Sequence, residues 1–296
     1  MSAYRTLDDL KVDGQRVLVR GDLNVPMAQG QVSDATRLER LAPTLRELSD
    51  KGARVIVISH FGRPKGERHA DMSLKPVAAA LGQVMDRDVA FADDCIGPPA
   101  ESVVNSLASG DIAVLENLRF HADEEANAPD FARALADLGD LYVNDAFSAA
   151  HRAHASTEQL AHLLPNAAGR QMQAELDALA AALDNPTHPV AAVVGGAKVS
   201  SKLEVLGHLV DKVDIIVIGG GMANTFLHAQ GIEVGASLHE PDLVDTARAI
   251  LAKAKSAGCE IVLPVDAVVA SELSDDAESE VCAIDAVPHK KMILDI

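Results

Sequence analysis

The chain has 296 residues, of which 48% are hydrophobic, and a formal net charge of −18 at pH 7. This length predicts two domains rather than one. The negative charge and the 3% aromatic content disfavour nucleic acid and anionic membranes as partners. Because no apolar run suggests a membrane span or signal peptide, we expect a cytoplasmic protein with reduced, buried thiols at Cys95, Cys259 and Cys282.

Short β-branched segments alternate with amphipathic helical segments along the chain. The first predicted strand, 16–20, is followed by a helix with Asp34 as N-cap and Gly52 as its stop, because apolar residues recur at helical spacing between 38 and 48. Further strands are predicted at 54–59, 88–92, 111–117, 141–146, 189–196, 214–220 and 260–265, with a ninth candidate at 279–284. This alternation predicts an α/β protein with two doubly wound parallel-sheet domains.

The boundary between the domains is predicted at an alanine-rich segment, "RQMQAELDALAAALDNP", at 170–186. It follows "LLPNAAG" and ends at Asn185-Pro186, which favours a helix connecting a first domain at 1–169 to a second at 187–296. The alternative is that this helix is one more covering helix of a single large sheet.

Polar residues follow the carboxyl ends of the strands predicted in the first half. In "VRGDLNVP" (19–26), Arg20, Asp22 and Asn24 alternate and so project from one face, although this segment alone fits a polar turn equally well. The same sheet edge receives further polar residues: Arg37, His60, Arg63, Asn117, Arg119, Asp145, His151 and Arg152. Clustered guanidinium groups repel one another unless an anion binds them, and they match carboxylate and phosphate groups. The sequence therefore predicts a site for a small ligand with at least two anionic groups.

Two glycine-rich segments follow strands in the second half. "VVGGAKVSSKLEVL" (193–206) predicts a strand, a turn and a helix that opens near residue 200, with Lys198 and Lys202 one helical turn apart. "IVIGGGMANTFL" (216–227) repeats the arrangement. Neither segment fits the dinucleotide fingerprint or the P-loop. Glycines admit close approach of a ligand and helix N-termini favour anions, so a nucleotide is the favoured ligand.

These segments resemble the phosphoglycerate kinase family. "RVLVRGDLNVP" resembles its signature, and "SHFGRPKG", "LENLRF", "NDAFSAAHRAHAS" and the two glycine-rich segments resemble its other blocks in the same order. The resemblance implies reversible phosphoryl transfer from 1,3-bisphosphoglycerate to MgADP in glycolysis, giving 3-phosphoglycerate and ATP. It also implies two Rossmann-like domains, with Mg²⁺ bound as part of the nucleotide complex. We expect a monomer, and we assign no residue of this chain as a metal ligand.

The resemblance assigns site residues to each domain. It implies that 3-phosphoglycerate binds Asp22, Leu23, Asn24, Arg37, His60, Phe61, Gly62, Arg63, Arg119 and Arg152. Nucleotide phosphates would lie near Gly195, Gly196, Lys198 and Lys202, and the adenine end near Gly220 and Gly221. We expect Arg37 and Lys198 to be catalytic and to converge on the transferring phosphoryl group after hinge closure at the 170–186 helix. Arg20 is expected to brace the site by pairing with a carboxylate, and no histidine is assigned as a proton shuttle.

The family pattern continues beyond "KKMILDI", where this sequence stops. The resemblance therefore implies an incomplete nucleotide domain with exposed apolar surface, and it leaves the activity of this chain open. One alternative is a non-catalytic phosphoglycerate-binding or scaffold fragment, which the presence of both Arg37 and the two-lysine turn disfavours. Another is an NAD-dependent dehydrogenase, which the missing fingerprint disfavours.

Overall fold

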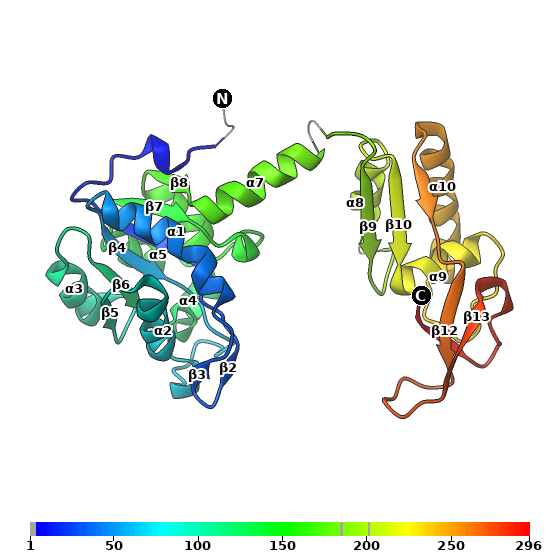
Figure 1. The fold of residues 1–296 in the computed structure, drawn as a ribbon, viewed down its shortest axis with the longest axis horizontal. Coiled ribbons are helices and arrows are strands. Elements are labelled where there is room, and N and C mark those ends of the chain that lie inside the picture. The colour runs from blue at the N-terminus through cyan, green and yellow to red at the C-terminus, as the bar shows by residue number, and fades with distance from the viewer. Residues whose placement is uncertain (1–3, 184–185, 201) are drawn as a thin grey trace. The chain divides into compact units, whose positions relative to one another are not determined.

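The computed structural model describes residues 4–183, 186–200 and 202–296. The chain divides into two compact units, Met1–Ala178 and Leu179–Ile296, called here the first and second unit (Figure 1). The predicted connecting helix forms α7 (Arg170–Leu183), while its predicted end at Asn185 lies outside the described residues. Among the described residues, no helix combines the length and apolar character needed to cross a membrane.

The first unit is built on a six-stranded parallel sheet. Its strand order is β5-β6-β4-β1-β7-β8, with β1 in the interior of the sheet. The strands are β1 (Arg16–Arg20), β4 (Arg54–Ile58), β5 (Val89–Ala92), β6 (Ile112–Leu115), β7 (Leu141–Asn144) and β8 (Asn166–Ala168). All neighbouring pairs are parallel, so the five strands predicted for this half are confirmed and β8 is added.

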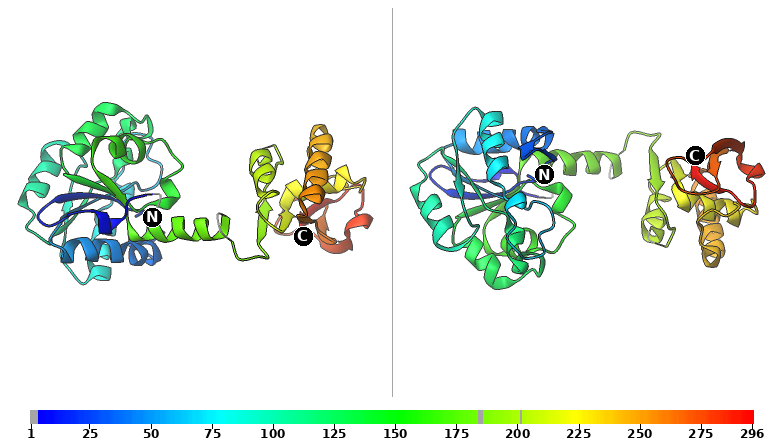
Figure 2. Two further views of the ribbon diagram at one scale, coloured as in Figure 1. Left: turned by 90° about the horizontal axis from the view of Figure 1, so that it is seen from above. Right: turned by 90° about the horizontal axis from the view of Figure 1, so that it is seen from below.

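Helices cover both faces of this sheet (Figure 2). Along β1, Val17 and Val19 belong to one core cluster and Leu18 to another, because successive strand residues point to opposite faces. The first cluster includes residues of α1 (Thr36–Asp50) and α2 (Lys75–Met85). The second includes residues of α3 (Gly97–Ser106), α5 (Pro129–Ala136) and α6 (Leu160–Leu163). The doubly wound prediction is therefore confirmed for the first unit.

Local signals explain the limits of α1. The side chain of Asp34 accepts a hydrogen bond of 2.8 Å from the Thr36 amide, while Ala35 occupies the cap position itself. Gly52 follows the helix with φ of +83°, a conformation that suits glycine and ends the helix as predicted. This unit also contains the hairpin strands β2 (Met27–Ala28) and β3 (Gln31–Val32), the helix α4 (Ala122–Glu125) and several short 3-10 turns.

The second unit contains a parallel and an antiparallel sheet. The parallel sheet has the order β11-β10-β9, from β9 (Ala191–Gly195), β10 (Ile215–Gly219) and β11 (Glu260–Val262), with helices α8 (Leu203–Leu209), α9 (Gly220–Ala229) and α10 (Val244–Ala257) between them. The ninth candidate strand is β13 (Ser279–Ala283), which pairs antiparallel with β12 (Asp266–Ala270), whose other neighbour is β14 (Met292–Asp295). The sequence analysis did not predict β12, β14 or the antiparallel pairing.

The parallel sheet of the second unit buries one face. Val194 and Ile218 are register partners and share a core cluster with residues of α8, α9 and α10. Val193, which points the other way, is 80% exposed, and Val262 at the same level of β11 is 37% exposed. Within the described part of this unit, the helices thus pack on one side of the sheet, and the expected exposed apolar surface is present.

Candidate active site

The carboxyl ends of four neighbouring strands carry the polar residues of the first unit. In the order β6, β4, β1, β7, these strands are followed by Asn117, His60, Asp22 and Asp145. Because all four strands run parallel, their carboxyl ends meet at one edge of the sheet. Two of these residues, Asn117 and Asp145, are fully buried, so their side chains support the loops at this edge and are not accessible to a ligand.

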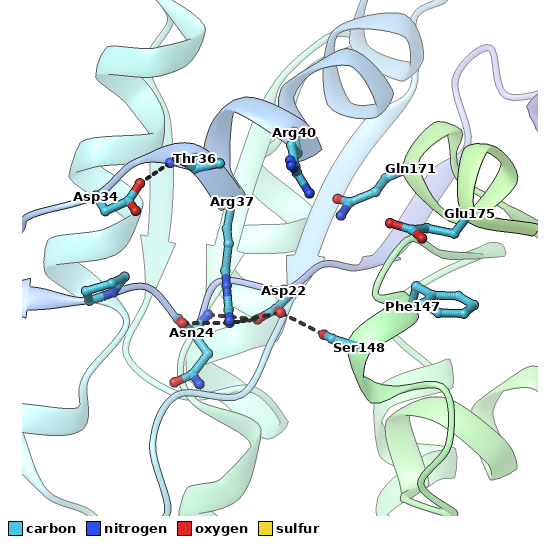
Figure 3. Close-up of a pocket in the computed structure, with 11 residues that line it drawn as sticks. Asp22, Asn24, Asp34, Thr36, Arg37, Arg40, Phe147, Ser148, Gln171 and Glu175 are labelled. Carbon is cyan, nitrogen blue, oxygen red and sulfur yellow. Dashed lines mark hydrogen bonds and ion pairs between the residues drawn. The ribbon is translucent and has the colours of Figure 1, made fainter. Parts of the chain in front are cut away.

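Asp22 is held by groups from three segments (Figure 3). Its Oδ2 lies 3.0 Å from Arg37 Nη1 and accepts a hydrogen bond of 2.7 Å from Ser148 Oγ. Its Oδ1 accepts a bond of 3.0 Å from the Asn24 amide. Burial would raise the pKa of Asp22, but the bonds from Ser148 and Asn24 and the charge of Arg37 outweigh it and place the pKa below its ordinary value. Asp22 is therefore ionised and oriented at neutral pH.

Arg37 projects from the first turn of α1 toward Asp22. Its Nη1 also donates to the Asn24 carbonyl at 2.8 Å, and its side chain remains 47% exposed. The guanidinium borders a pocket of about 460 Å³ lined by Asp22, Asn24, Pro26, Asp34, Thr36, Arg37, Arg40, Phe147, Ser148, Gln171 and Glu175. The position allows Arg37 to meet a ligand in this pocket with part of its donor fork.

Arg20 is a structural cation beneath the site, and it is only 1% exposed. It donates from Nε to Ser156 Oγ at 2.9 Å and from Nη1 to the Gly21 carbonyl at 2.7 Å, and its Nη2 lies 3.1 Å from His60 Nδ1. Ser156 in turn donates to Glu124, with its hydroxyl at 2.6 Å and its amide at 3.0 Å. The expected direct pairing of Arg20 with a carboxylate is thus wrong for the residues described here, because a serine hydroxyl lies between the two charges.

His60 lies within a group of positive charges. Burial, followed by the charges of Arg20 and Arg119, lowers the pKa of His60 to about 3, and Arg152 adds to this effect while Asp22 opposes it. The imidazole is therefore neutral at physiological pH. A group with so low a pKa is a poor carrier of protons near neutral pH. The guanidinium groups of Arg20, Arg119 and Arg152 all contribute to this low pKa.

Arg119 is buried, with 4% of its surface exposed. Its Nη1 donates to the Gly62 carbonyl at 2.7 Å, and its Nε lies 3.0 Å from Glu125 Oε1 without the alignment of a hydrogen bond. Burial lowers the pKa of Arg119, and the charge of Glu125 opposes that effect. The Gly62 amide donates to Asn24 Oδ1 at 2.9 Å, so Gly62 links the guanidinium to the segment after β1.

The other residues assigned to the glycerate site differ in their placement. The side chains of Leu23 and Phe61 lie in the core, and their amides donate to Ser59 Oγ at 3.0 Å and Asn117 Oδ1 at 3.1 Å. These two residues therefore shape the loops of the site. Arg63 is exposed on the loop after β4.

Three residues important to this site were missed by the sequence analysis. Ser148 and Ser156 lie within the segment "NDAFSAAHRAHAS", where only the charged residues had been considered. Glu124 follows the "LENLRF" segment and is wholly buried despite its charge. The signal that could have identified the serines is their position in a loop that directly follows a central strand.

In the second unit, the two glycine-rich turns pack backbone against backbone. The Met222 amide donates to the Gly196 carbonyl at 2.9 Å. A Cβ atom on Gly220, which has φ of +66°, would lie 3.0 Å from Gly196 O, and one on Gly221 would lie 2.9 Å from Ala197 O. The turns therefore require glycine at these positions, and they bring the four glycines predicted to bind the nucleotide into one place.

The lysines of the first turn lie outside the helix. Helix α8 begins at Leu203 with Lys202 as its N-cap, slightly later in the chain than the expected opening near residue 200. Ser200 instead donates to Glu240 from its amide at 3.1 Å and its hydroxyl at 2.7 Å. Lys198 lies in the turn before Ser200, and its charge helps to lower the pKa of Glu240 after the larger effect of the Ser200 hydrogen bonds.

Two of the three thiols are buried as predicted. Cys95 and Cys259 are buried, whereas Cys282 is only partly buried. In the described residues, one group of possible metal ligands exists: Cys95, Asp94 and His121, whose ligand atoms lie within 4.8 Å of one another. Asp94 already pairs with His121 at 2.8 Å, and burial raises the pKa of the Cys95 thiol well above its ordinary value. Cys95 is therefore a packed thiol, not a nucleophile.

The fold and these features define an α/β protein with basic side chains gathered at one sheet edge of the first unit and two glycine-rich turns in the second. The family model "Phosphoglycerate kinase" matches residues 7–296. The phosphoglycerate kinase of Allorhizobium ampelinum is 61% identical over 297 residues, covering 100% of this chain and 74% of the relative. That of Bradyrhizobium diazoefficiens is 62% identical over 293 residues, covering 99% of this chain and 73% of the relative.

Solved structures of phosphoglycerate kinases also match this chain. The phosphoglycerate kinase of Coxiella burnetii superposes with a TM-score of 0.84 at 39% identity, covering 99% of this chain and 74% of that structure. The phosphoglycerate kinase of Pyrococcus horikoshii superposes with a TM-score of 0.80 at 30% identity, covering 99% of this chain and 75% of that structure. The chain therefore belongs to the phosphoglycerate kinase family, and it spans about three quarters of the length of these relatives.

Membership of this family confirms the predicted class of enzyme. The relatives are named as kinases, so the predictions of a phosphotransferase and of a role in glycolysis are confirmed. The alternative of a non-catalytic binding or scaffold fragment has no support among them.

Proposed function

We propose that the first unit binds 3-phosphoglycerate and 1,3-bisphosphoglycerate at the carboxyl edge of its sheet, and that the second unit binds the adenine nucleotide. The observation that carries this proposal is the group of Arg20, Arg119 and Arg152 acting on the neutral His60. Cations gathered at one sheet edge, in a chain whose net charge is −18, favour the binding of an anion there. The glycerates, with a carboxyl end and a phosphate end, match that requirement.

Each polar group of the edge has a role in this proposal. Arg63, Arg119 and Arg152 bind the anionic groups of the glycerate, since guanidinium donors pair well with phosphate and carboxylate. Asp22 accepts a hydrogen bond from the glycerate hydroxyl, and Asn24 orients the loop beside it. His60 contributes a neutral hydrogen-bonding group. Leu23, Phe61 and Gly62 act through the loop geometry described above.

The nucleotide is assigned to the glycine-rich turns of the second unit. Gly195 and Gly196 allow its phosphates to approach the backbone, and Lys198 and Lys202 supply positive charge. Gly220 and Gly221 lie beside the first turn and border the adenine end. Mg²⁺ arrives bound to the nucleotide phosphates, and it reduces the negative charge of the transferring group.

We assign catalysis to Arg37 and Lys198. In the ATP-forming direction a phosphate oxygen of ADP attacks the 1-phosphoryl group, and the carboxylate leaves, so no proton must be transferred. The low pKa of His60 makes it a poor general base, and the proposed reaction needs none. The requirement is stabilisation of the transferring phosphoryl charge by cations, which the two residues provide. Because the two ligands bind to different units, they must approach each other for transfer. We assign this movement to bending at the connector, residues 170–186.

Two further properties belong to the proposal. Both ligand sites draw on residues of one chain, which supports a monomer. The cytoplasm is supported by the three free thiols, because such thiols persist in a reducing compartment.

The glycerate site can be tested by calorimetric titration of 3-phosphoglycerate into the protein. Arg152→Met removes a cation of the proposed site, and Arg133→Met removes an exposed cation of α5 as the matched control. We expect affinity to fall at least about 10-fold in the first variant, corresponding to about 1.4 kcal/mol, and to stay unchanged in the second. Equal affinities in the two variants would place the ligand elsewhere. ATP formation from 1,3-bisphosphoglycerate and MgADP tests the complete reaction.

A further inference from the structure

Ser148 lies beside Asp22 although 126 positions separate them in the chain. Asp22 follows β1, and Ser148 belongs to the short 3-10 turn Phe147–Ala149 after β7, the strand that pairs with β1. The Ser148 hydroxyl donates to Asp22 Oδ2 at 2.7 Å and borders the same pocket as Arg37 (Figure 3). Ser148 is not among the residues to which a role in ligand binding was assigned above.

The hydrogen bonds of Asp22 indicate what the serine does. A carboxylate has about four acceptor positions. One Arg37 nitrogen is shared between Oδ1 at 3.1 Å and Oδ2 at 3.0 Å, while Asn24 and Ser148 hold one oxygen each. If Arg37 turns toward a phosphoryl group, Asn24 and Ser148 are the two donors that remain. They then hold both oxygens in place and leave acceptor positions for a ligand hydroxyl.

We propose that Ser148 is a positioning residue, which holds Asp22 ready for the glycerate hydroxyl while Arg37 exchanges Asp22 for the phosphoryl group. This inference rests on the proposed function, because it assumes that Arg37 and Asp22 both meet the glycerate. Asn24 binds Oδ1 through its backbone, so it cannot replace the bond at Oδ2. Without the hydroxyl, Oδ2 would lose its protein donor at the moment when the ligand binds.

The effect of Ser148 on Asp22 should also appear in the pH dependence of ligand binding, because Ser148 influences the pKa of Asp22. Arg37 from α1 is the cation that acts on Asp22, whereas His60 from the loop after β4 is neutral over the pH range of the experiment below. The pocket also contains Asp34, Arg40 and Glu175. After the opposing effect of burial, the Ser148 bond is the largest influence on the pKa of Asp22, and it lowers that pKa. Loss of the hydroxyl therefore raises the pKa of Asp22, so that protonation of this carboxyl begins at a higher pH than in the wild type.

The test measures binding of 3-phosphoglycerate by calorimetry from pH 4.5 to 7.5 for the full chain and its variants. Ser148→Ala removes the hydroxyl, Ser148→Thr retains it, and Ser106→Ala removes an exposed hydroxyl of α3 as the control. We expect about 10-fold weaker binding for Ser148→Ala at pH 7, near the lower end for a hydrogen bond to a charged group. The loss should grow as the pH falls, whereas Ser148→Thr and Ser106→Ala should follow the wild type.

The outcomes separate this inference from the proposed function. If the wild type binds and Ser148→Ala binds equally well at every pH, Ser148 does not position Asp22. A loss that Ser148→Thr does not restore would indicate a merely structural role and also overturn the inference. If the wild type itself does not bind 3-phosphoglycerate, the proposed function fails first. Titration of the ligand phosphate affects all variants alike and cancels in the comparison.

Discussion

Replacement of Arg20 by methionine should destabilise the first unit strongly. The buried Arg20 guanidinium is joined through Ser156 to Glu124, which is 0% exposed. Removal of one partner of a buried charge pair costs about 3–5 kcal/mol when the other charge is left buried and unpaired. Glu124 keeps its two hydrogen bonds from Ser156 after the substitution. Arg119 also acts on Glu124 electrostatically, although both groups are desolvated. We therefore expect the free energy of unfolding to fall by about 3 kcal/mol, the lower end of that range.

Tyrosine fluorescence during urea denaturation measures this loss for the first unit alone. The chain has two tyrosines and no tryptophan. Tyr4 and Tyr142 both belong to the first unit, and Tyr142 donates its hydroxyl to the Ser156 carbonyl at 2.8 Å. The Tyr142 signal therefore comes from the network that the substitution perturbs.

A double-mutant cycle tests the reasoning. Glu124→Gln removes the buried negative charge, and the loss in the Arg20→Met/Glu124→Gln protein should be smaller than the sum of the two single losses by about 1 kcal/mol or more. Arg133→Met, at an exposed position on α5, should change stability by less than about 0.5 kcal/mol. Strictly additive losses would refute the coupling through Ser156, and an unchanged urea midpoint for Arg20→Met would refute the buried-charge argument altogether.

Four further outcomes are expected. Arg37→Ala should lower turnover by about 10³-fold or more in steady-state assays while 3-phosphoglycerate binding weakens much less, because cationic stabilisation is needed mainly in the transition state; equal losses would leave Arg37 only a binding role. Lys198→Met should slow transfer with an unchanged circular dichroism spectrum, and wild-type turnover would contradict its catalytic assignment. His60→Gln should preserve the shape of the pH–rate profile between about pH 5.5 and 8, since the His60 pKa of about 3 keeps the imidazole neutral there; loss of a limb of the profile would show that it titrates. Cys282, which is partly buried, should react first with a thiol reagent, whereas the buried Cys95 should react only after unfolding, as followed by absorbance; early labelling of Cys95 would contradict its packing.

The strands that the sequence analysis missed have short or interrupted patterns. The segment of β8 reads "NAA", which has no β-branched residue, and it becomes a strand only because β7 offers it a parallel partner. The strands β12 and β14 pair antiparallel in the sheet that they form with β13. Their register depends on contacts between segments distant in the sequence, which local patterns do not contain.

The interactions between site residues were also beyond the reach of pattern analysis. Arg20 was expected to meet a carboxylate, yet its Nε contacts Ser156, 136 positions away. A neutral serine has no periodicity or charge signal that would indicate such a partner. The same holds for Ser148, whose contact with Asp22 requires β1 and β7 to be neighbours.

By itself, the sequence determined the alternation of apolar strands and amphipathic helices, and the placement of cations after the strands. Both are local properties, because hydrophobic periodicity and charge are carried by each segment independently of its neighbours. Only the tertiary structure decided the strand order and the antiparallel sheet of the second unit. It also decided which buried donor compensates which carboxylate, because each of these depends on distances between segments that meet only after folding.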